Sequence, residues 1–142
     1  MIMQKVTFIN RAAAEQKLGS VSSAIISITQ PNTSPAILQS GWYSVLPIQF
    51  DDTNPEVIKR KERKIPRIAM TLADATTIVK FVHQTAPDIE EMIVHCQGGI
   101  SRSAAVAKWI AEAYELPFDH DYDLFNPYVY QLLKDANKRI KR

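Results

Sequence analysis

The residues whose side chains are best suited to catalysis lie together at positions 95–103, which read His-Cys-Gln-Gly-Gly-Ile-Ser-Arg-Ser. A cysteine ends an apolar stretch, glycines follow it, and five residues separate Cys96 from Arg102. Glycines allow a short loop to curl so that its backbone N–H groups converge and bind an anion. The planar guanidinium of an arginine adds two donors that match two oxygens of a phosphate. The pattern therefore predicts a phosphate-binding loop that contains a thiol.

The same loop should activate Cys96. Where a loop enters a helix, its free N–H groups and the helix dipole favour negative charge. Such surroundings lower the pKa of a cysteine from about 8.5 into a range of roughly 3.5–7.5. A thiolate beside a bound phosphate ester can attack phosphorus, so we expect Cys96 to be the nucleophile and Arg102 the phosphate clamp. The predicted phosphate-binding residues are Gln97, Gly98, Gly99, Ile100, Ser101 and Arg102.

Two adjacent aspartates are candidates for the proton donor that such a reaction needs. Asp51 and Asp52 directly follow the end of an apolar segment, residues 44–50, that is typical of a strand. In a parallel sheet the loop after this strand lies at the same carboxyl edge as Cys96. A carboxylic acid at that edge can protonate the leaving oxygen. The residues alone leave open which aspartate does so, or whether the pair only forms a solvated turn.

Residues 95–103 resemble the active-site motif of the protein tyrosine phosphatase superfamily, HCxxGxxRS. Its fixed positions are matched by His95, Cys96, Gly99, Arg102 and Ser103. The short chain resembles the dual-specificity branch of these cysteine-based phosphatases. The segment Gly-Ile-Ser-Arg-Ser is similar to the corresponding sequence in small bacterial and phage-type members. Residues 48–52 are similar to the general-acid segment of the family, and Asn126-Pro127 is similar to the opening of its last helix. The likeness spans roughly residues 23–133.

The resemblance implies a role for each matched residue. Ser103 would donate a hydrogen bond that helps the thiolate to leave, and His95 would orient the loop through side-chain hydrogen bonds. Asp52 matches the general acid of the family better than Asp51, which stays the alternative. The stretch from Asp52 to Cys96 is longer than in compact members of the family. No metal and no cofactor are implied, because Arg102 and the backbone amides neutralise the phosphate.

The implied function is hydrolysis of a phosphomonoester by a protein tyrosine or dual-specificity phosphatase, through a cysteinyl-phosphate intermediate. The expected partner is a phosphorylated substrate, in the first place a phosphoprotein, while a nucleotide, an RNA end or a lipid head group stays open. Two weaker alternatives are a phosphate-binding module without catalysis and a rhodanese-like sulfurtransferase. A lone cysteine is more often a small buried apolar residue. The matched residues around Cys96 argue against that interpretation.

The rest of the sequence predicts the elements that position the loop. Short runs rich in β-branched residues predict strands at residues 6–9, 24–29, 44–50 and 92–95. Apolar spacing predicts helices at residues 11–18, 72–84, 103–115 and 127–140. Asn10, Thr71 and Asn126 are the expected caps at the start of the first, second and fourth of these helices, and Gly19 is expected to end the first. Residues 51–67 are expected to form a solvated excursion, with Asn54-Pro55 as a possible start of a short helix. Strands that alternate with helices predict a three-layer α/β fold, phosphotyrosine phosphatase-like, with a mostly parallel central sheet of four to five strands flanked by helices.

Length, charge and residue spacing bear on the number of domains and argue against nucleic-acid binding, a disulfide and a metal site. The 142 residues are expected to form a single domain, residues 1–142. A net charge of +2, from 17 basic and 15 acidic residues, does not favour nucleic-acid binding. One cysteine excludes an internal disulfide, and the three histidines lack the spacing of metal ligands. The charged run 59–64 is more typical of a solvated face than of a surface that gathers acidic substrates.

The sequence also carries an expectation about location. No apolar run reaches the length of a membrane span, and residues 1–10 lack the pattern of a secretion signal. The expected location is therefore the cytoplasm, without contact to a membrane. The oligomeric state is left open.

Overall fold

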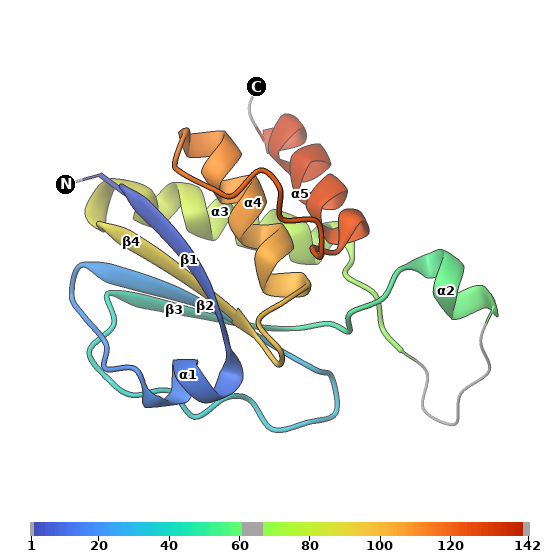
Figure 1. Ribbon diagram of the computed structural model, residues 1–142, viewed down its shortest axis with the longest axis horizontal. Coiled ribbons are helices and arrows are strands. Elements are labelled where there is room, and N and C mark those ends of the chain that lie inside the picture. The colour runs from blue at the N-terminus through green and yellow to red at the C-terminus, as the bar shows by residue number, and fades with distance from the viewer. Residues whose placement is uncertain (1, 61–66, 141–142) are drawn as a thin grey trace.

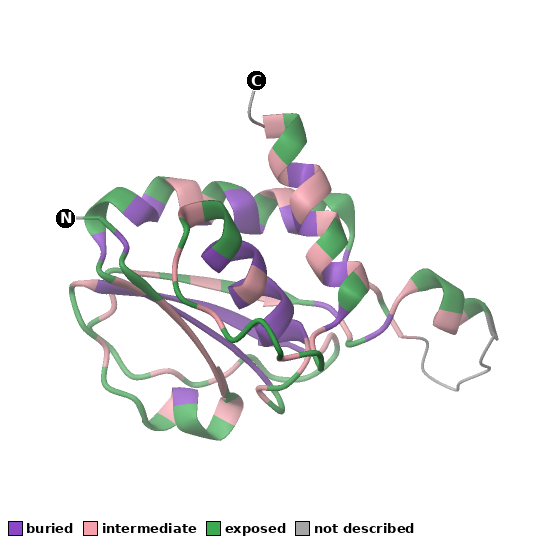
Figure 2. Cartoon of the chain, turned by 45° about the horizontal axis from the view of Figure 1, so that its top comes forward, coloured by how far each residue is buried: buried purple, intermediate pink, exposed green. Residues whose placement is uncertain are grey.

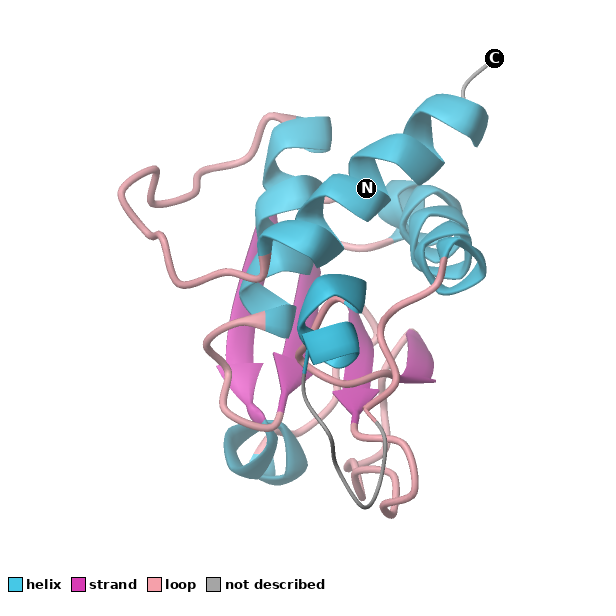
Figure 3. Ribbon diagram, turned by 90° about the vertical axis from the view of Figure 1, so that its right-hand side faces the viewer, coloured by secondary structure: helices cyan, strands magenta, loops and turns pink. Residues whose placement is uncertain are grey.

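Four parallel strands form the central sheet of the computed structural model, which describes residues 2–60 and 67–140. The strands are β1 (Lys5–Asn10), β2 (Ser23–Thr29), β3 (Ser44–Gln49) and β4 (Glu91–Cys96). They lie in the order β1-β4-β2-β3, and each neighbouring pair is parallel. The arrowheads that are clearly visible in Figure 3 accordingly point the same way. The carboxyl ends of the four strands meet at one edge, which is where the sequence predicts the site.

Helices cover the two faces of the sheet unequally (Figure 1). The helices are α1 (Arg11–Gln16), α2 (Pro55–Arg60), α3 (Leu72–Thr85), α4 (Arg102–Tyr114) and α5 (Pro127–Ile140), with a 3₁₀ turn at Ala86–Asp88. Three of them, α3, α4 and α5, lie on one face, whereas α1 and the loop of residues 30–43 lie on the other. The predicted α/β architecture is confirmed: the sheet has four strands and, in the described residues, its second face is covered only by α1 and this loop.

The two central strands are buried, while the edge strands are half-buried (Figure 2). All of β2 is buried, and so are residues 92–96 of β4. Strands covered on both faces need apolar side chains at successive positions, which explains their short unbroken apolar runs. Ile26 belongs to the large core cluster below α3, α4 and α5, whereas Ile25 packs with Ala14 of α1.

Side-chain caps begin α1, α3 and α5 where the sequence predicts them. The amide of Ala13 donates to the Asn10 side chain at 2.8 Å, which caps α1. Thr71 and Asp74 form a reciprocal capping box at the start of α3. Asn126 accepts the amide of Val129 at 3.1 Å and caps α5. Helix α4 begins one residue earlier than predicted, at Arg102.

The first helix is shorter than predicted. It ends at Gln16 rather than Leu18, and Lys17 is already extended. Gly19 does not end the helix: a Cβ at this position would lie 2.5 Å from the carbonyl oxygen of Ser40. The glycine therefore allows two loops to approach closely, a contact between segments distant in sequence.

The segment after β3 contains the short helix α2, which projects from the body of the molecule (Figure 1). The predicted helix start is confirmed, since the amide of Val57 donates to the Asn54 side chain at 3.0 Å. Residues 61–64 of the charged run 59–64 lie outside the described residues. Within the ranges that the structure describes, no helix is both long enough and apolar enough to cross a membrane.

Candidate active site

The loop between β4 and α4 curls because of Gly99, which has a backbone φ of +65°. A Cβ on Gly99 would lie 2.5 Å from the backbone nitrogen of Asn10, at the junction of β1 and α1. Gly98 is different, because a Cβ there would meet only the Ile100 side chain at 3.8 Å. The loop therefore depends on Gly99, the glycine that the motif fixes, and tolerates a side chain at Gly98.

Helix α4 starts directly behind this loop, so its first amides point towards the loop. The residue before the helix, Ser101, does not cap it with its side chain. The Ser101 hydroxyl instead donates to Asp52 at 2.8 Å. The amides at the start of α4 are therefore not covered by the Ser101 side chain, and together with the helix dipole they favour an anion.

Cys96 is the last residue of β4, next to these amides, and is 2% exposed. Its Sγ lies 3.1 Å from the Ser103 hydroxyl oxygen. Burial raises the pKa of the thiol, but hydrogen bonds from the Ser103 hydroxyl and amide lower it. The charge of Arg102 and the Gly99 amide lower it further, and the net pKa is below the ordinary value. The site therefore favours the thiolate, which is the nucleophilic form.

Arg102 is buried at the start of α4, with 4% of its surface exposed. One guanidinium nitrogen, Nη1, donates to the carbonyl oxygen of Phe50 at 2.8 Å, which ties the loop to the end of β3. Its Nε is also buried and has no hydrogen-bond partner among the residues that the structure describes. A buried unpaired donor costs about 1–3 kcal/mol, so an acceptor at this position would be stabilising. An oxyanion bound in the loop would provide such an acceptor.

His95 lies below the loop and is completely buried. Its Nε2 is 2.6 Å from the Ser27 hydroxyl on β2, and its Nδ1 is 3.5 Å from the Cys96 carbonyl oxygen. Burial lowers the pKa of His95, which favours the neutral ring. The side chain connects the end of β4 to the neighbouring strand, an arrangement suited to orienting the loop.

The two candidate acids have different partners. Asp52 is exposed, and its Oδ1 accepts both the Ser101 hydroxyl and the Asn126 amide group, each at 2.8 Å. The Asp51 carboxylate instead accepts the backbone amide of Ile68 at 2.7 Å. The Asp51 amide donates back to the Ile68 carbonyl oxygen at 2.7 Å. The structure thus brings Asp52 to the loop, while Asp51 joins two backbone segments.

Two further residues contact the loop without having been predicted as site residues. The Tyr122 hydroxyl donates to the Ile100 carbonyl oxygen at 2.5 Å, and its ring packs edge-on against Phe8 at 5.2 Å. Burial, followed by the charges of Cys96 and Asp123, raises the pKa of Tyr122, so the hydroxyl remains a donor. Asn126, expected only as a helix cap, also bonds to Asp52. Both contacts join segments that no local pattern relates.

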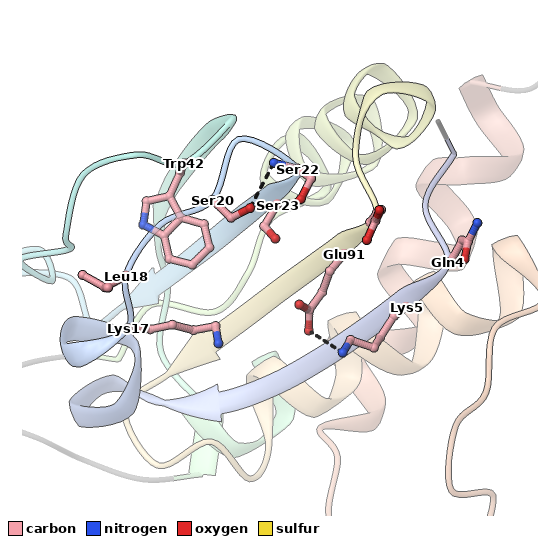
Figure 4. Close-up of a pocket in the computed structure, with 10 residues that line it drawn as sticks. Gln4, Lys5, Lys17, Leu18, Ser20, Ser22, Ser23, Trp42 and Glu91 are labelled. Atoms are coloured by element: carbon pink, nitrogen blue, oxygen red, sulfur yellow. Dashed lines mark hydrogen bonds and ion pairs between the residues drawn. The ribbon is translucent and has the colours of Figure 1, made fainter.

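A separate cavity of about 490 Å³ lies at the opposite end of the sheet (Figure 4). Its lining residues are Gln4, Lys5, Lys17, Leu18, Ser20, Ser22, Ser23, Trp42, Glu90 and Glu91. Lys5 lies 3.8 Å from Glu91, so these two charges pair with each other. No predicted site residue lines this cavity. In the described part of the chain, no group of three or more His, Cys, Asp or Glu residues could hold a metal ion.

Comparison with known proteins identifies the fold. No protein-family model matches the sequence, and no curated protein is significantly similar to it. Human tyrosine phosphatase-like serine/threonine/tyrosine-interacting protein superposes with a TM-score of 0.60 and 19% identity, covering 94% of this chain and 91% of that one. Human DUSP28 superposes with a TM-score of 0.51 and 16% identity, covering 94% and 79%. The chain has the fold of these dual-specificity phosphatase structures. The resemblance to small bacterial and phage-type members stays a prediction.

Proposed function

We propose that this chain, which has the fold of dual-specificity phosphatases, hydrolyses phosphomonoesters through a phosphorylated cysteine. One observation carries the proposal: a thiol with a lowered pKa, a buried arginine and a carboxylate all belong to or contact a single loop. The Arg102 guanidinium and the loop amides supply the charge that a phosphoryl group needs. The reaction therefore requires no metal ion.

The first step transfers the phosphoryl group to Cys96. The thiolate attacks phosphorus as the bond between phosphorus and the leaving oxygen breaks. Asp52 donates its proton to that oxygen, so a neutral alcohol or phenol departs. Both hydrogen bonds of Asp52 end on Oδ1, which leaves Oδ2 as the oxygen that carries the proton. The Arg102 guanidinium and the loop amides hold the three remaining oxygens of the phosphoryl group.

The second step restores the enzyme. Water attacks phosphorus, Asp52 accepts a proton from it, and the bond between sulfur and phosphorus breaks. The Ser103 hydroxyl, 3.1 Å from Sγ, stabilises the departing thiolate by a hydrogen bond. Inorganic phosphate then leaves the loop. We propose phosphotyrosine in proteins as the first substrate class, with phosphoserine and phosphothreonine as further substrates.

The test is hydrolysis of an aryl phosphate in EDTA. Wild-type protein should turn over, whereas Cys96→Ser should not, although it should still bind vanadate because the amides and Arg102 remain. Activity that depends on a metal ion, or full activity of Cys96→Ser, would contradict the proposal. Vanadate binding without any hydrolysis by wild-type protein would identify a binding module. Sulfur transfer from thiosulfate to cyanide would identify a rhodanese-like enzyme.

The acid is tested separately. Asp52→Asn should slow substrates with poor leaving groups by about 10²-fold or more, because general acid catalysis typically contributes 10²–10⁴-fold. It should spare dinitrophenyl phosphate, whose leaving group needs no proton. Asp51→Asn, whose side chain bonds to Ile68 rather than to the loop, is the matched control and should affect both substrates equally. A leaving-group effect confined to Asp51→Asn would reverse the two assignments.

A further inference from the structure

We propose that Asn126 is a positioning residue that holds Asp52 in place and couples the acid loop, residues 50–54 between β3 and α2, to the phosphate-binding loop. This inference rests on the reaction proposed above, in which Asp52 is the general acid. Asn126 begins the last helix, 74 residues after Asp52 along the chain. Its side chain contacts no reacting atom, so its effect on the reaction would act through Asp52.

The Asn126 amide group reaches the acid loop directly. Its Nδ2 donates to Asp52 Oδ1 at 2.8 Å and lies 3.4 Å from the carbonyl oxygen of Thr53. One nitrogen therefore contacts both the acid and the backbone that follows it. The residue is 7% exposed, which shields these bonds from competition with water.

The other polar atoms of Asn126 fix its own position. Its backbone amide donates to the carbonyl oxygen of Ser101 in the phosphate-binding loop at 3.1 Å. Its side-chain Oδ1 accepts the amide of Val129, and its carbonyl oxygen accepts the amide of Tyr130, both at 3.1 Å. The residue is thus held by α5 and by the loop, and a side chain fixed in this way can orient a neighbour.

Asp52 needs such support because it is exposed and lies on the segment that leads to the projecting helix α2. The described contacts that orient its carboxylate are those from Ser101 and Asn126. Without the Asn126 donor, a single hydroxyl would hold the acid. A displacement of about 1 Å from the productive geometry can reduce a rate by roughly 10²-fold.

The test compares Asn126→Ser with Asn54→Ser. Serine retains a helix cap at either position, but it is too short to reach Asp52 from position 126. Asn54 is a matched control because it caps α2 in the same way, through the Val57 amide at 3.0 Å. Each variant is assayed for kcat and KM on phenyl phosphate and on dinitrophenyl phosphate.

We expect Asn126→Ser to lower kcat on phenyl phosphate by roughly 10- to 100-fold, with an unchanged KM, and to leave dinitrophenyl phosphate within about twofold. Asn54→Ser should leave both substrates within about twofold. Combined with Asp52→Asn, the Asn126→Ser change should have no further effect, because the acid that it positions is already absent. Asn126→Asp, which keeps the cap but sets a second carboxylate against Asp52, should be impaired at least as much as Asn126→Ser.

Three results would overturn the inference. Equal losses on both substrates would assign Asn126 a structural role alone. A loss on phenyl phosphate that persists in the Asp52→Asn background would show that Asn126 acts elsewhere. If Asp52→Asn itself shows no dependence on the leaving group while wild-type protein still hydrolyses both substrates, the acid assignment and this inference fail together, but the phosphatase proposal stands.

Discussion

The two ends of the parallel sheet carry similar kinds of side chains but offer different chemistry. At the amino ends of the strands, charged and polar side chains surround a cavity of about 490 Å³. Lys5 pairs with Glu91 there, and the backbone amides of these two residues already donate to the carbonyl oxygens of Glu90 and Ser22. At the carboxyl ends, the chain leaves β4 through a glycine loop and enters α4, so that backbone amides of the loop and of the first turn of α4, among them those of Gly99 and Ser103, converge on Cys96.

In the proposed site, chain direction rather than the number of charged side chains makes the carboxyl edge suited to an oxyanion. A strand that leads into a helix exposes the helix amino terminus at the carboxyl edge of the sheet. The opposite edge receives the carboxyl ends of helices, which disfavour negative charge. The cavity at the amino ends of the strands therefore offers less to a phosphate than the loop after β4 does.

After the loss of turnover expected for Cys96→Ser, the largest effect at the carboxyl edge should come from Arg102→Lys. Lysine keeps the positive charge but cannot form the planar pair of donors, so we expect a loss of about 10³-fold in kcat/KM on an aryl phosphate. Arg11→Lys is the control, because the Arg11 guanidinium bonds to Glu15 at 3.2 Å instead of facing the thiol. Nearly full activity of Arg102→Lys would mean that the arginine is only structural.

The next-largest effect should distinguish a substitution at Gly99 from the same substitution at Gly98. Gly99→Ala forces a side chain into a position with φ +65° and a 2.5 Å contact with backbone, whereas Gly98→Ala meets only the Ile100 side chain. We expect Gly99→Ala to lose vanadate affinity and to lower the melting temperature, since a left-handed backbone alone costs about 1–2 kcal/mol. Gly98→Ala should bind vanadate normally. Equal behaviour of the two variants would contradict the loop geometry.

A smaller effect concerns the charge state of Cys96. The Ser103 hydroxyl lowers the pKa of the thiol, so Ser103→Ala should raise that pKa. Thiolate formation, and with it alkylation by iodoacetamide, should then begin at higher pH than in the wild-type protein. The measurement is the alkylation rate as a function of pH, which is independent of turnover. A midpoint that stays unchanged would mean that the hydroxyl does not stabilise the thiolate.

The smallest effect is expected at the amino edge. Lys17→Gln and Glu90→Gln change exposed charges that line the cavity there. Surface substitutions of this kind usually change stability by less than about 0.5 kcal/mol, and kcat/KM should stay within about twofold. A strong loss of activity in either variant would show that the two edges are functionally connected.

Most of the fold could be predicted from the sequence because its signals are local. The apolar runs of the buried strands and the caps at Asn10, Thr71 and Asn126 depend on neighbouring residues only, and these elements begin or end within about a residue of their predicted bounds. The end of α1 was missed because Gly19 serves a contact with Ser40, in a distant loop. Helix propensity cannot reveal such a contact.

The same distinction applies to the candidate site. The loop from His95 to Ser103 is continuous in sequence, so its residues could be predicted together. Residue types alone left Asp51 and Asp52 equivalent, and only the resemblance to the phosphatase family favoured Asp52. The contacts with Ile68 and Ser101, which distinguish the two in the structure, join segments that are distant in sequence. The second role of Asn126 was missed for the same reason: its bond to Asp52 depends on how α5 packs beside the acid loop.

The phosphorylated cysteine is the central claim, and trapping it is the most direct test. Protein mixed with a phosphotyrosine peptide and quenched in acid during the first turnovers should carry one phosphoryl group on Cys96, as located by mass spectrometry of the digested chain. Ser103→Ala should increase the trapped fraction, because the hydroxyl 3.1 Å from Sγ assists departure of the thiolate. Hydrolysis of the peptide with Cys96 unmodified, or with the phosphoryl group on another residue, would contradict the mechanism.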